Sequence, residues 1–323
     1  MSRKQSLVCE SCGSSDIYRN RCRSCKSKNI IVSDLPVSPY RSVDEILEDR
    51  LKEEVRTFSA EKVNSNLCVT FPHSHPIAIV AMGDPHLDDK GTAMSRVIED
   101  LETIKGHPHV YGLCVGDITN NWVGRLERLY GQQTTGVVDS WELLKWFCDY
   151  IPWLAIVLGN HDLWNSGAGL IKQLTHGKIV QADECLFNIR FKNGKEVSVS
   201  ARHKWRGQSQ WNPAHGISKH AQMGFDYDII IGGHTHVSAY AQVLGARRRT
   251  LSHCIQLASY KMLDSYARTE GFKDHNISPS MAIVIDPNAQ RLEDRIIVTY
   301  SVQKGVKLLD ALLADYKKVC KTQ

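Results

Sequence analysis

Five short apolar runs in this chain each end in residues that can bind a metal ion, and this repeated pattern constrains the fold most. The runs begin near residues 77, 110, 153, 197 and 227, and their length and apolar character predict buried strands. The residues that end them are Gly83-Asp84-Pro85-His86, Gly116-Asp117, Gly159-Asn160-His161-Asp162, His203 and Gly232-Gly233-His234-Thr235-His236. Because ligands of α/β sheets bind at the carboxyl ends of strands, the pattern predicts one site at one edge.

The candidate ligands are carboxylate, imidazole and amide groups, with no cysteine among them. Oxygen and imidazole ligands suit Mn²⁺, Fe²⁺ or Zn²⁺. Seven candidates are too many for one catalytic ion and enough for two: Asp84, His86, Asp117, Asn160, His203, His234 and His236. A pair of ions about 3.5–4 Å apart is a common arrangement for displacement at phosphorus. The sequence therefore predicts a dinuclear centre that acts on phosphate esters.

In order and spacing, the series Asp-x-His, Gly-Asp, Gly-Asn-His-Asp, His and Gly-His-x-His resembles the calcineurin-like metallophosphoesterase superfamily, over about residues 76–300. The resemblance implies a pair of β-sheets flanked by helices, with a dinuclear metal site. One branch, the phosphoprotein phosphatases, carries Gly-Asp-x-x-Asp-Arg-Gly. This chain has Gly116-Asp117-Ile-Thr-Asn-Asn-Trp122 instead, so that branch is disfavoured.

The resemblance also implies a role for each motif residue. Asp84, His86 and His236 would hold the first ion, Asp117 would bridge both ions, and Asn160, His203 and His234 would hold the second. His161 would act as the acid beside the leaving-group oxygen, and Asp162 would orient it. His107, His109, His215 and His220 lie outside the motifs, and for them ordinary surface or core positions are preferred.

From residue 76 onward, apolar runs alternate with helical stretches at 92–105 and 139–150, which favours βαβ units. Asn193-Gly194 between two alternating runs predicts a β-hairpin, and a helix is expected at about 304–320. The predicted fold class is α/β: a two-sheet β-sandwich flanked by helices, spanning residues 76–323 as the metallophosphoesterase domain, plus a small N-terminal zinc ribbon.

Residues 1–32 hold two Cys-x-x-Cys pairs and few large aliphatic side chains. Cys9, Cys12, Cys22 and Cys25 suit tetrahedral coordination of one structural Zn²⁺, which would supply the folding energy that the segment lacks. Residues 33–75 are predicted to form a linker and an amphipathic helix that docks on the main domain. Ser42 and Glu45 match a capping box at the start of this helix.

Several observations bear on the environment of the chain. The six other cysteines are scattered singly, which indicates free thiols in a reducing, cytoplasmic setting. The sequence contains no run of about 18 apolar residues, so no membrane span is predicted. A formal charge of +5 is compatible with a polyanionic partner without requiring one. The sequence carries no signal for an oligomeric state.

The substrate is the least determined feature. Lys204, Trp205 and Arg206 follow a predicted metal ligand, and basic side chains beside an indole can bind phosphate and stack a base; the alternative is that Trp205 packs the loop down. The ribbon is also rich in Lys and Arg, which suits either nucleic acid or a protein-docking role. We expect a phosphodiesterase or nuclease acting on nucleic acid; the alternative is a phosphomonoesterase or a small-molecule phosphodiesterase of the cyclic-nucleotide type. A non-catalytic binding module is disfavoured by the complete ligand set.

Overall fold

The computed structural model describes residues 5–19, 21–34, 41–64, 67–165, 167–175, 177–209, 211–224, 226–245, 250–262 and 278–322. The chain divides into two compact units, Met1–Val63 and Asn64–Gln323. Within the described residues, no helix combines the length and hydropathy that a membrane span needs.

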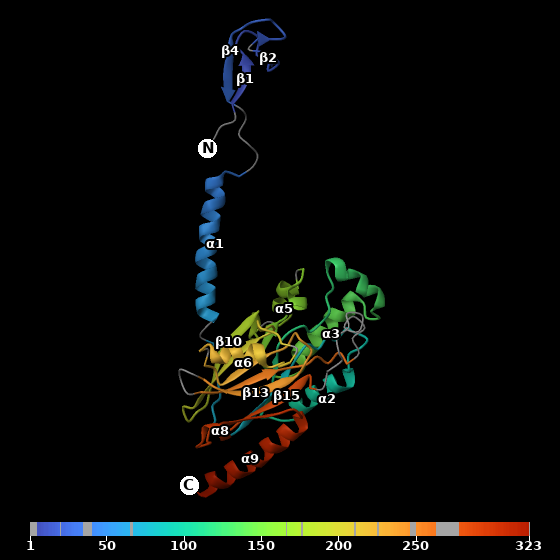
Figure 1. The fold of residues 1–323 in the computed structure, drawn as a ribbon, viewed down its shortest axis with the longest axis vertical. Helices are drawn as coiled ribbons and strands as arrows, with labels where there is room; N and C mark the ends of the chain where they lie inside the picture. The colour runs from blue at the N-terminus through green and yellow to red at the C-terminus, as the bar shows by residue number, and fades with distance from the viewer. Residues whose placement is uncertain are drawn as a thin grey trace. The chain divides into compact units, whose positions relative to one another are not determined.

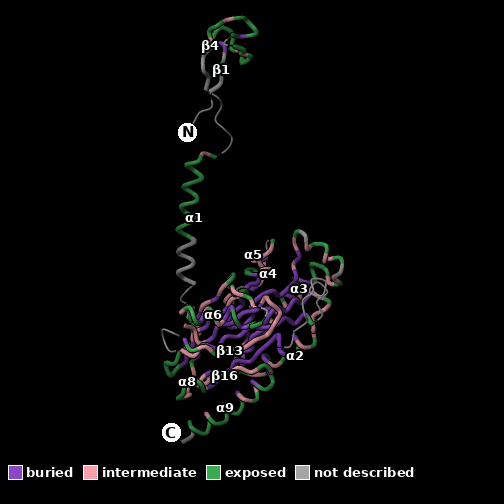
Figure 2. The backbone as a smooth tube through the Cα atoms, in the orientation of Figure 1, coloured by how far each residue is buried: buried purple, intermediate pink, exposed green. Residues whose placement is uncertain are grey.

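The first unit consists of two small antiparallel sheets and a helix. Strand β1 (Gln5–Cys9) pairs with β4 (Ile30–Asp34), and β2 (Ile17–Tyr18) pairs with β3 (Arg21–Cys22). Helix α1 (Val43–Asn64) begins with the predicted capping box: the Glu45 backbone N–H donates to Ser42 Oγ (3.2 Å), and the Ser42 N–H donates to Glu45 Oε2 (2.7 Å). The apolar side chains of its first turns, such as Ile46 and Leu51, are exposed (Figure 2). The docking of this face on the main domain stays a prediction.

The second unit contains two six-stranded sheets (Figure 1). The first has the order β13 (Ala239–Leu244), β14 (Leu251–Gln256), β12 (Ile229–Gly232), β11 (Glu196–Arg202), β10 (Glu184–Arg190) and β5 (Leu67–Thr70). The second has the order β16 (Ile296–Thr299), β15 (Ser280–Ile285), β6 (Ile77–Met82), β7 (Val110–Cys114), β8 (Trp153–Leu158) and β9 (Val180–Ala182). The described helices of the second unit are α2 (Met94–Lys105), the 3-10 helix η1 (Gly124–Gln132), α3 (Val137–Tyr150), α4 (Asn160–Leu163), α5 (Gly167–Leu174), α6 (His215–Gln222), α8 (Leu292–Arg295) and α9 (Val302–Thr322).

Strand β6 shows how the sheets and helices share the core. Successive side chains of a strand point to opposite faces, and all six residues of β6 are buried. Ile77 and Ile79 pack in the cluster between the two sheets, whereas Ala78, Val80 and Met82 pack in a second cluster with α2, α3 and α9. Figure 1 shows α9 running along the sheet beside β15. The predicted sandwich flanked by helices is confirmed.

The strand pairings place the predicted motifs at common edges. Strands β6, β7, β8 and β9 are parallel neighbours, as are β11 and β12. The predicted hairpin joins β10 to β11, with Gly194 at φ 80° in its turn. Strand β5 lies before the expected start of the domain at residue 76, yet it pairs with β10. Residues 67–70 are therefore part of the sandwich and not of the linker.

Candidate metal centre

The carboxyl ends of five strands bring together all seven predicted ligands. Asp84 and His86 follow β6, Asp117 follows β7, and Asn160 follows β8. His203 follows β11, and His234 and His236 follow β12. Two glycines allow the close approach of these loops: a Cβ on Gly159 would lie 2.1 Å from Asp117 Oδ1, and one on Gly233 would lie 2.4 Å from Asp84 Oδ1.

Asp117 belongs to both halves of the centre. Its carboxylate lies near ring nitrogens of His86 and His161 in one group, and near those of His203 and His234 in another. Its Oδ1 accepts the backbone N–H of His161 (2.9 Å), and its Oδ2 lies 3.2 Å from His203 Nε2. A shared carboxylate between two ligand groups is the arrangement that a bridging ligand requires.

In the group formed with Asn160 and His234, His203 contacts both other residues. Its Nε2 lies 3.1 Å from both Asn160 Oδ1 and His234 Nδ1. Its Nδ1 lies 2.7 Å from the carbonyl oxygen of Val115. An Nδ1–H that donates to this carbonyl fixes the ring and leaves the Nε2 lone pair available to a metal ion, an arrangement common at metal-binding histidines.

In the first half, Asp84 joins the ends of β6 and β12. Its Oδ2 accepts the backbone N–H of His234 (2.7 Å) and lies 3.4 Å from His236 Nε2. The rings of His86 and His236 face each other edge-on, with centroids 5.3 Å apart.

The backbone at these loops is strained. Asp84 (φ 42°), His86 (φ 42°), Asp117 (φ 53°), His234 (φ 70°) and His236 (φ 55°) all occupy the left-handed region. Such conformations cost roughly 1–3 kcal/mol each for residues other than glycine, and they cluster at functional sites. The strain is therefore tied to the placement of the ligand atoms.

Buried polar atoms without partners test whether a metal fits here. His86 is 2% exposed, and neither of its ring nitrogens has a hydrogen-bond partner; the same holds for Asp84 Oδ1. Leaving one such group unsatisfied costs about 1–3 kcal/mol. Cations bound among these atoms would satisfy them, so the residues fit a divalent-metal centre.

The titratable groups of the centre change one another's pKa values. Burial raises the pKa of Asp84 well above its usual value, with Asp117 adding to the effect. Burial opposes the charged form of His203, but the carboxylates of Asp117 and Asp84 outweigh it and raise its pKa to about 10. Burial and the charge of His203 lower the pKa of His234 to about 3. The centre concentrates negative charge and compensates it with a proton, which a bound cation would replace.

His161 faces the centre but is oriented differently from the expectation. Its Nδ1 is hydrogen-bonded to the carbonyl oxygen of Asn120, and its ring packs between Trp122 and Trp164, with centroids 5.1 and 4.2 Å away. Its Nε2 lies 3.9 Å from Asp117 Oδ2. The carbonyl of Asn120, rather than Asp162, therefore orients this imidazole.

Asp162 instead braces the backbone. Its Oδ2 accepts the N–H groups of Asp117 (2.7 Å) and Gly159 (2.9 Å), and its Oδ1 accepts that of Ile118 (3.0 Å). Burial, with the charge of Asp117 adding to it, raises the pKa of Asp162 to about 7. Its carboxylate ties the loop after β7 to the loop after β8.

The three residues predicted to contact the substrate, Lys204, Trp205 and Arg206, differ in their exposure to solvent. Lys204 and Arg206 are exposed, but Trp205 is only 7% exposed and packs against Ile217 and Ile230, and its Nε1–H donates to the carbonyl of Ile231 (3.0 Å). The prediction that Trp205 stacks on a base is wrong, because its indole is part of the core beneath α6. Trp211, on the same loop, is 95% exposed.

A polar network beside the centre was not foreseen in the sequence. Buried Asp88 accepts from the Asn120 N–H (2.8 Å), Gln133 Nε2 (2.8 Å) and Ser140 Oγ (3.1 Å). The Nζ of Lys261, a residue only 4% exposed, lies 3.0 Å from Asp89 Oδ2. The one available signal was the position of Asp88 and Asp89 just after the first motif.

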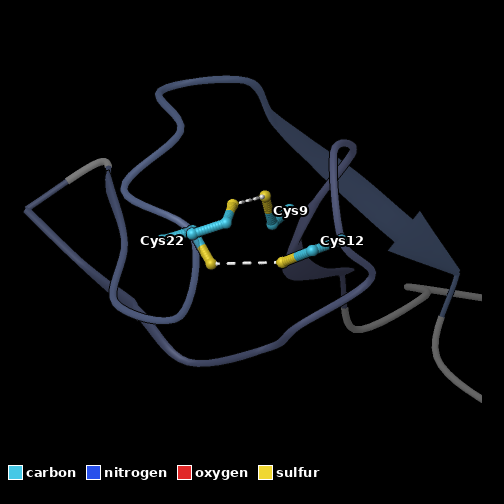
Figure 3. Close-up of side chains that lie close together, drawn as sticks. Cys9, Cys12 and Cys22 are labelled. Carbon is cyan, nitrogen blue, oxygen red and sulfur yellow. Dashed lines mark hydrogen bonds between the residues drawn. The ribbon is translucent and has the colours of Figure 1, made fainter.

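The four cysteines of the first unit also converge. Their sulfur atoms lie within 4.8 Å of one another, with Cys9 Sγ 3.4 Å from Cys25 Sγ and Cys12 Sγ 3.5 Å from Cys22 Sγ. Figure 3 shows Cys9, Cys12 and Cys22 pointing toward a common centre. The four thiols form a cluster that suits tetrahedral zinc.

Comparison with known proteins places this architecture in a family. Among solved structures, the chain is similar to a Vps29 double mutant from Entamoeba histolytica (14% identity, TM-score 0.38, 69% of this chain and 97% of that one). It is also similar to a 5′-nucleotidase from Candida albicans (14% identity, TM-score 0.35, 77% and 59%) and to a phosphatase from Mycoplasma pneumoniae (10% identity, TM-score 0.36, 69% and 92%). No curated protein sequence matches the chain. Residues 77–238, half of the 323 residues, match the calcineurin-like phosphoesterase family. The chain therefore belongs to this family of hydrolases.

Proposed function

We propose that this phosphoesterase is a phosphodiesterase that cleaves nucleic acid at the centre formed by the five strand ends. The observation that carries the substrate class is the loop after His203, where an almost fully exposed indole, Trp211, follows exposed Lys204 and Arg206. Exposed aromatic rings beside basic side chains bind single strands by stacking and phosphate contact.

Two divalent ions, Mn²⁺, Fe²⁺ or Zn²⁺, fit the ligands that converge here. In this proposal Asp84, His86 and His236 would hold one ion, Asn160, His203 and His234 would hold the other, and Asp117 would serve both. When bound, such ions supply an activated water nucleophile and stabilise charge on the phosphoryl oxygens. The protein fixes the ligand geometry through backbone N–H donors and carbonyl acceptors.

His161 is assigned the role of general acid. The hydrogen bond from its Nδ1–H to the Asn120 carbonyl holds the ring so that Nε2 faces the centre. A proton on Nε2 can then pass to the oxygen of the departing alcohol or sugar, which otherwise would leave as an alkoxide. Trp122 and Trp164 both pack against the ring and limit its rotation.

The proposed zinc ribbon carries a second exposed aromatic ring beside basic side chains, which suits nucleic acid in the same way. The Tyr18 ring is 53% exposed, and the guanidinium carbons of Arg23 and Arg19 lie 4.7 and 5.4 Å from its centroid. An exposed tyrosine beside two arginines can stack a base while contacting phosphates.

The test compares substrates with the full-length protein and Mn²⁺. Labelled single- and double-stranded DNA and RNA are assayed beside bis(p-nitrophenyl) phosphate, p-nitrophenyl phosphate and cyclic nucleotides. We expect cleavage of an oligonucleotide, and binding that weakens steeply with salt. Trp211→Ala should weaken single-strand binding by about 1–3 kcal/mol and leave hydrolysis of the small diester unchanged.

Tyr300→Ala is the matched control, because it removes another exposed aromatic ring (48% exposed) at the end of β16. Equal oligonucleotide affinity in Trp211→Ala and the unmodified protein would refute the stacking role. No oligonucleotide binding at low salt, together with rapid turnover of cyclic nucleotides or monoesters, would favour the small-molecule alternative.

A further inference from the structure

Three histidines outside the catalytic centre form a cluster of their own. His73 and His75 lie in the segment between β5 and β6, and His109 lies just before β7. The ring centroids of His73 and His75 are 3.3 Å apart, and those of His75 and His109 are 4.1 Å apart. One ring nitrogen from each residue lies within 4.8 Å of the other two.

This cluster is distant from the catalytic centre. It precedes β6 and β7, whereas Asp84 and Asp117 follow them. Six residues of β6 separate the two ends, which corresponds to about 20 Å at about 3.3 Å per residue. The histidine cluster is therefore at the opposite edge of the sheet.

His73 and His75 each have a ring nitrogen available as a ligand. His73 Nδ1 is buried and has no hydrogen-bond partner. His75 Nδ1 lies 3.3 Å from the carbonyl oxygen of Pro76, so an Nδ1–H donated there leaves Nε2 with its lone pair. A backbone carbonyl that accepts from one ring nitrogen commonly orients a metal-binding histidine in this way.

The neighbouring His107, in contrast, has a partner for each of its ring nitrogens. Its Nδ1 accepts the backbone N–H of His109 (3.1 Å), and its Nε2 pairs with Asp310 Oδ1 (3.1 Å). Both of its nitrogens are used, in contrast to Nδ1 of His73.

The protonation state of the cluster also favours a metal. Burial, followed by the proximity of His75 and His109, lowers the pKa of His73 to about 4. Burial and the same crowding lower the pKa of His109. Neutral imidazole is the form that binds metal ions, so these two rings are ready to bind at neutral pH.

We propose that His73, His75 and His109 bind a divalent transition-metal ion, with Zn²⁺ as the best match, at a site separate from the catalytic pair. Three imidazoles and one open position are a known zinc coordination set. Zn–N distances of about 2.0–2.1 Å place tetrahedral ligand nitrogens about 3.4 Å apart, so the stacked rings of His73 and His75 must rotate to direct their lone pairs at one ion.

The ion would fasten the crossover between the two sheets. The segment with His73 and His75 leaves β5 in one sheet and enters β6 in the other. The carbonyl of His73 accepts the backbone N–H of Lys192 (3.1 Å) beside β10, whereas His109 is fixed to β7. A metal bound to all three residues links both sheets at the edge opposite the catalytic centre.

The experiment measures zinc in the full-length protein after chelation and reconstitution with Zn²⁺. We expect His75→Asn and His109→Asn each to hold one zinc equivalent less than the unmodified protein and to retain hydrolysis of bis(p-nitrophenyl) phosphate. His215→Asn is the matched control and should hold the full complement, because His215 is exposed and starts α6.

Diffraction from zinc-soaked crystals of the unmodified protein gives a second measurement that does not depend on any variant. An anomalous peak at the zinc edge among the three rings is expected. No peak there at saturating zinc, or an equal zinc content in all four proteins, would overturn the proposal and leave a packed cluster of imidazoles. Retained diester hydrolysis separates either result from a failure of the catalytic assignment.

Discussion

At the scale of single residues, Asp117 connects the most parts of the catalytic centre. Its carboxylate contacts the His161 N–H and His203, and its own N–H is held by Asp162. Burial opposes the charged form of Asp117, but the nearby His203 and His161 outweigh it and lower the pKa of Asp117 below its usual value. This carboxylate is therefore ionised throughout the physiological pH range.

We expect Asp117→Asn to lose both metal and turnover. The amide keeps the shape but removes the negative charge that both ions would share. The loss of affinity should exceed the roughly 10–100-fold that removal of an outer-shell partner costs. Elemental analysis beside a diester assay measures it, with the exposed Asp139→Asn as control. An active Asp117→Asn protein that still binds two ions would contradict the bridging role.

We expect His161→Gln to keep both metals and to lose about 10²–10⁴-fold in rate on esters with poor leaving groups. Nitrophenyl esters should lose much less, because nitrophenolate departs without a proton. The measurement is the rate of each protein across a series of leaving groups. Equal losses for alkyl and nitrophenyl esters would remove His161 from the acid role.

The convergence of the candidate ligand residues was predictable, because a strand end fixes where a residue lies. The direction of a side chain was less predictable. Asp162 follows His161 in the chain, yet its carboxylate turns back to three N–H groups, since a buried carboxylate must satisfy its own oxygens first. Trp205 lies beyond the end of β11, and its indole packs with Ile217 and Ile230 beneath α6, a position that its two-residue spacing from His203 does not predict.

At the scale of elements, α6 depends on that indole. Trp205 fills the space between α6 and the first sheet, where its ring centroid lies 4.4 Å from that of His220. Truncating a buried tryptophan costs about 3–5 kcal/mol. We expect Trp205→Ala to lower the free energy of unfolding by about that amount, as measured in urea, with Trp211→Ala unchanged as the matched control. Equal stability of the two variants would contradict the buried position.

The long apolar strands and the Asn-Gly hairpin were predictable from periodicity and turn chemistry. Strand β5 was not, because four residues with a half-exposed alternating pattern carry little signal. Its place depends on parallel pairing with β10, far along the chain. A contact of that kind is decided by tertiary structure.

At the scale of the whole molecule, the four-cysteine ribbon belongs to a unit separate from the hydrolase. We expect Cys22→Ser to release one zinc ion and to leave the melting temperature and small-diester activity of the hydrolase unchanged, because every proposed catalytic ligand lies beyond residue 83. Zinc analysis and calorimetry measure this, with the exposed Cys320→Ser as control. Loss of diester hydrolysis in Cys22→Ser alone would contradict the independence of the two units.

The pairing of β6 with β15 has a consequence for synthesis on the ribosome. The four cysteines of the ribbon lie between residues 9 and 25 of the 323-residue chain. They therefore leave the ribosome early and can bind zinc then. In contrast, Ile77 of β6 lies opposite Ile285 of β15. One side of β6, a wholly apolar strand, therefore has no partner strand until residue 285 has been synthesised. Unpaired apolar strands are prone to aggregate during folding. The nascent hydrolase should therefore need chaperone protection until its last strands leave the ribosome, long after the ribbon is complete.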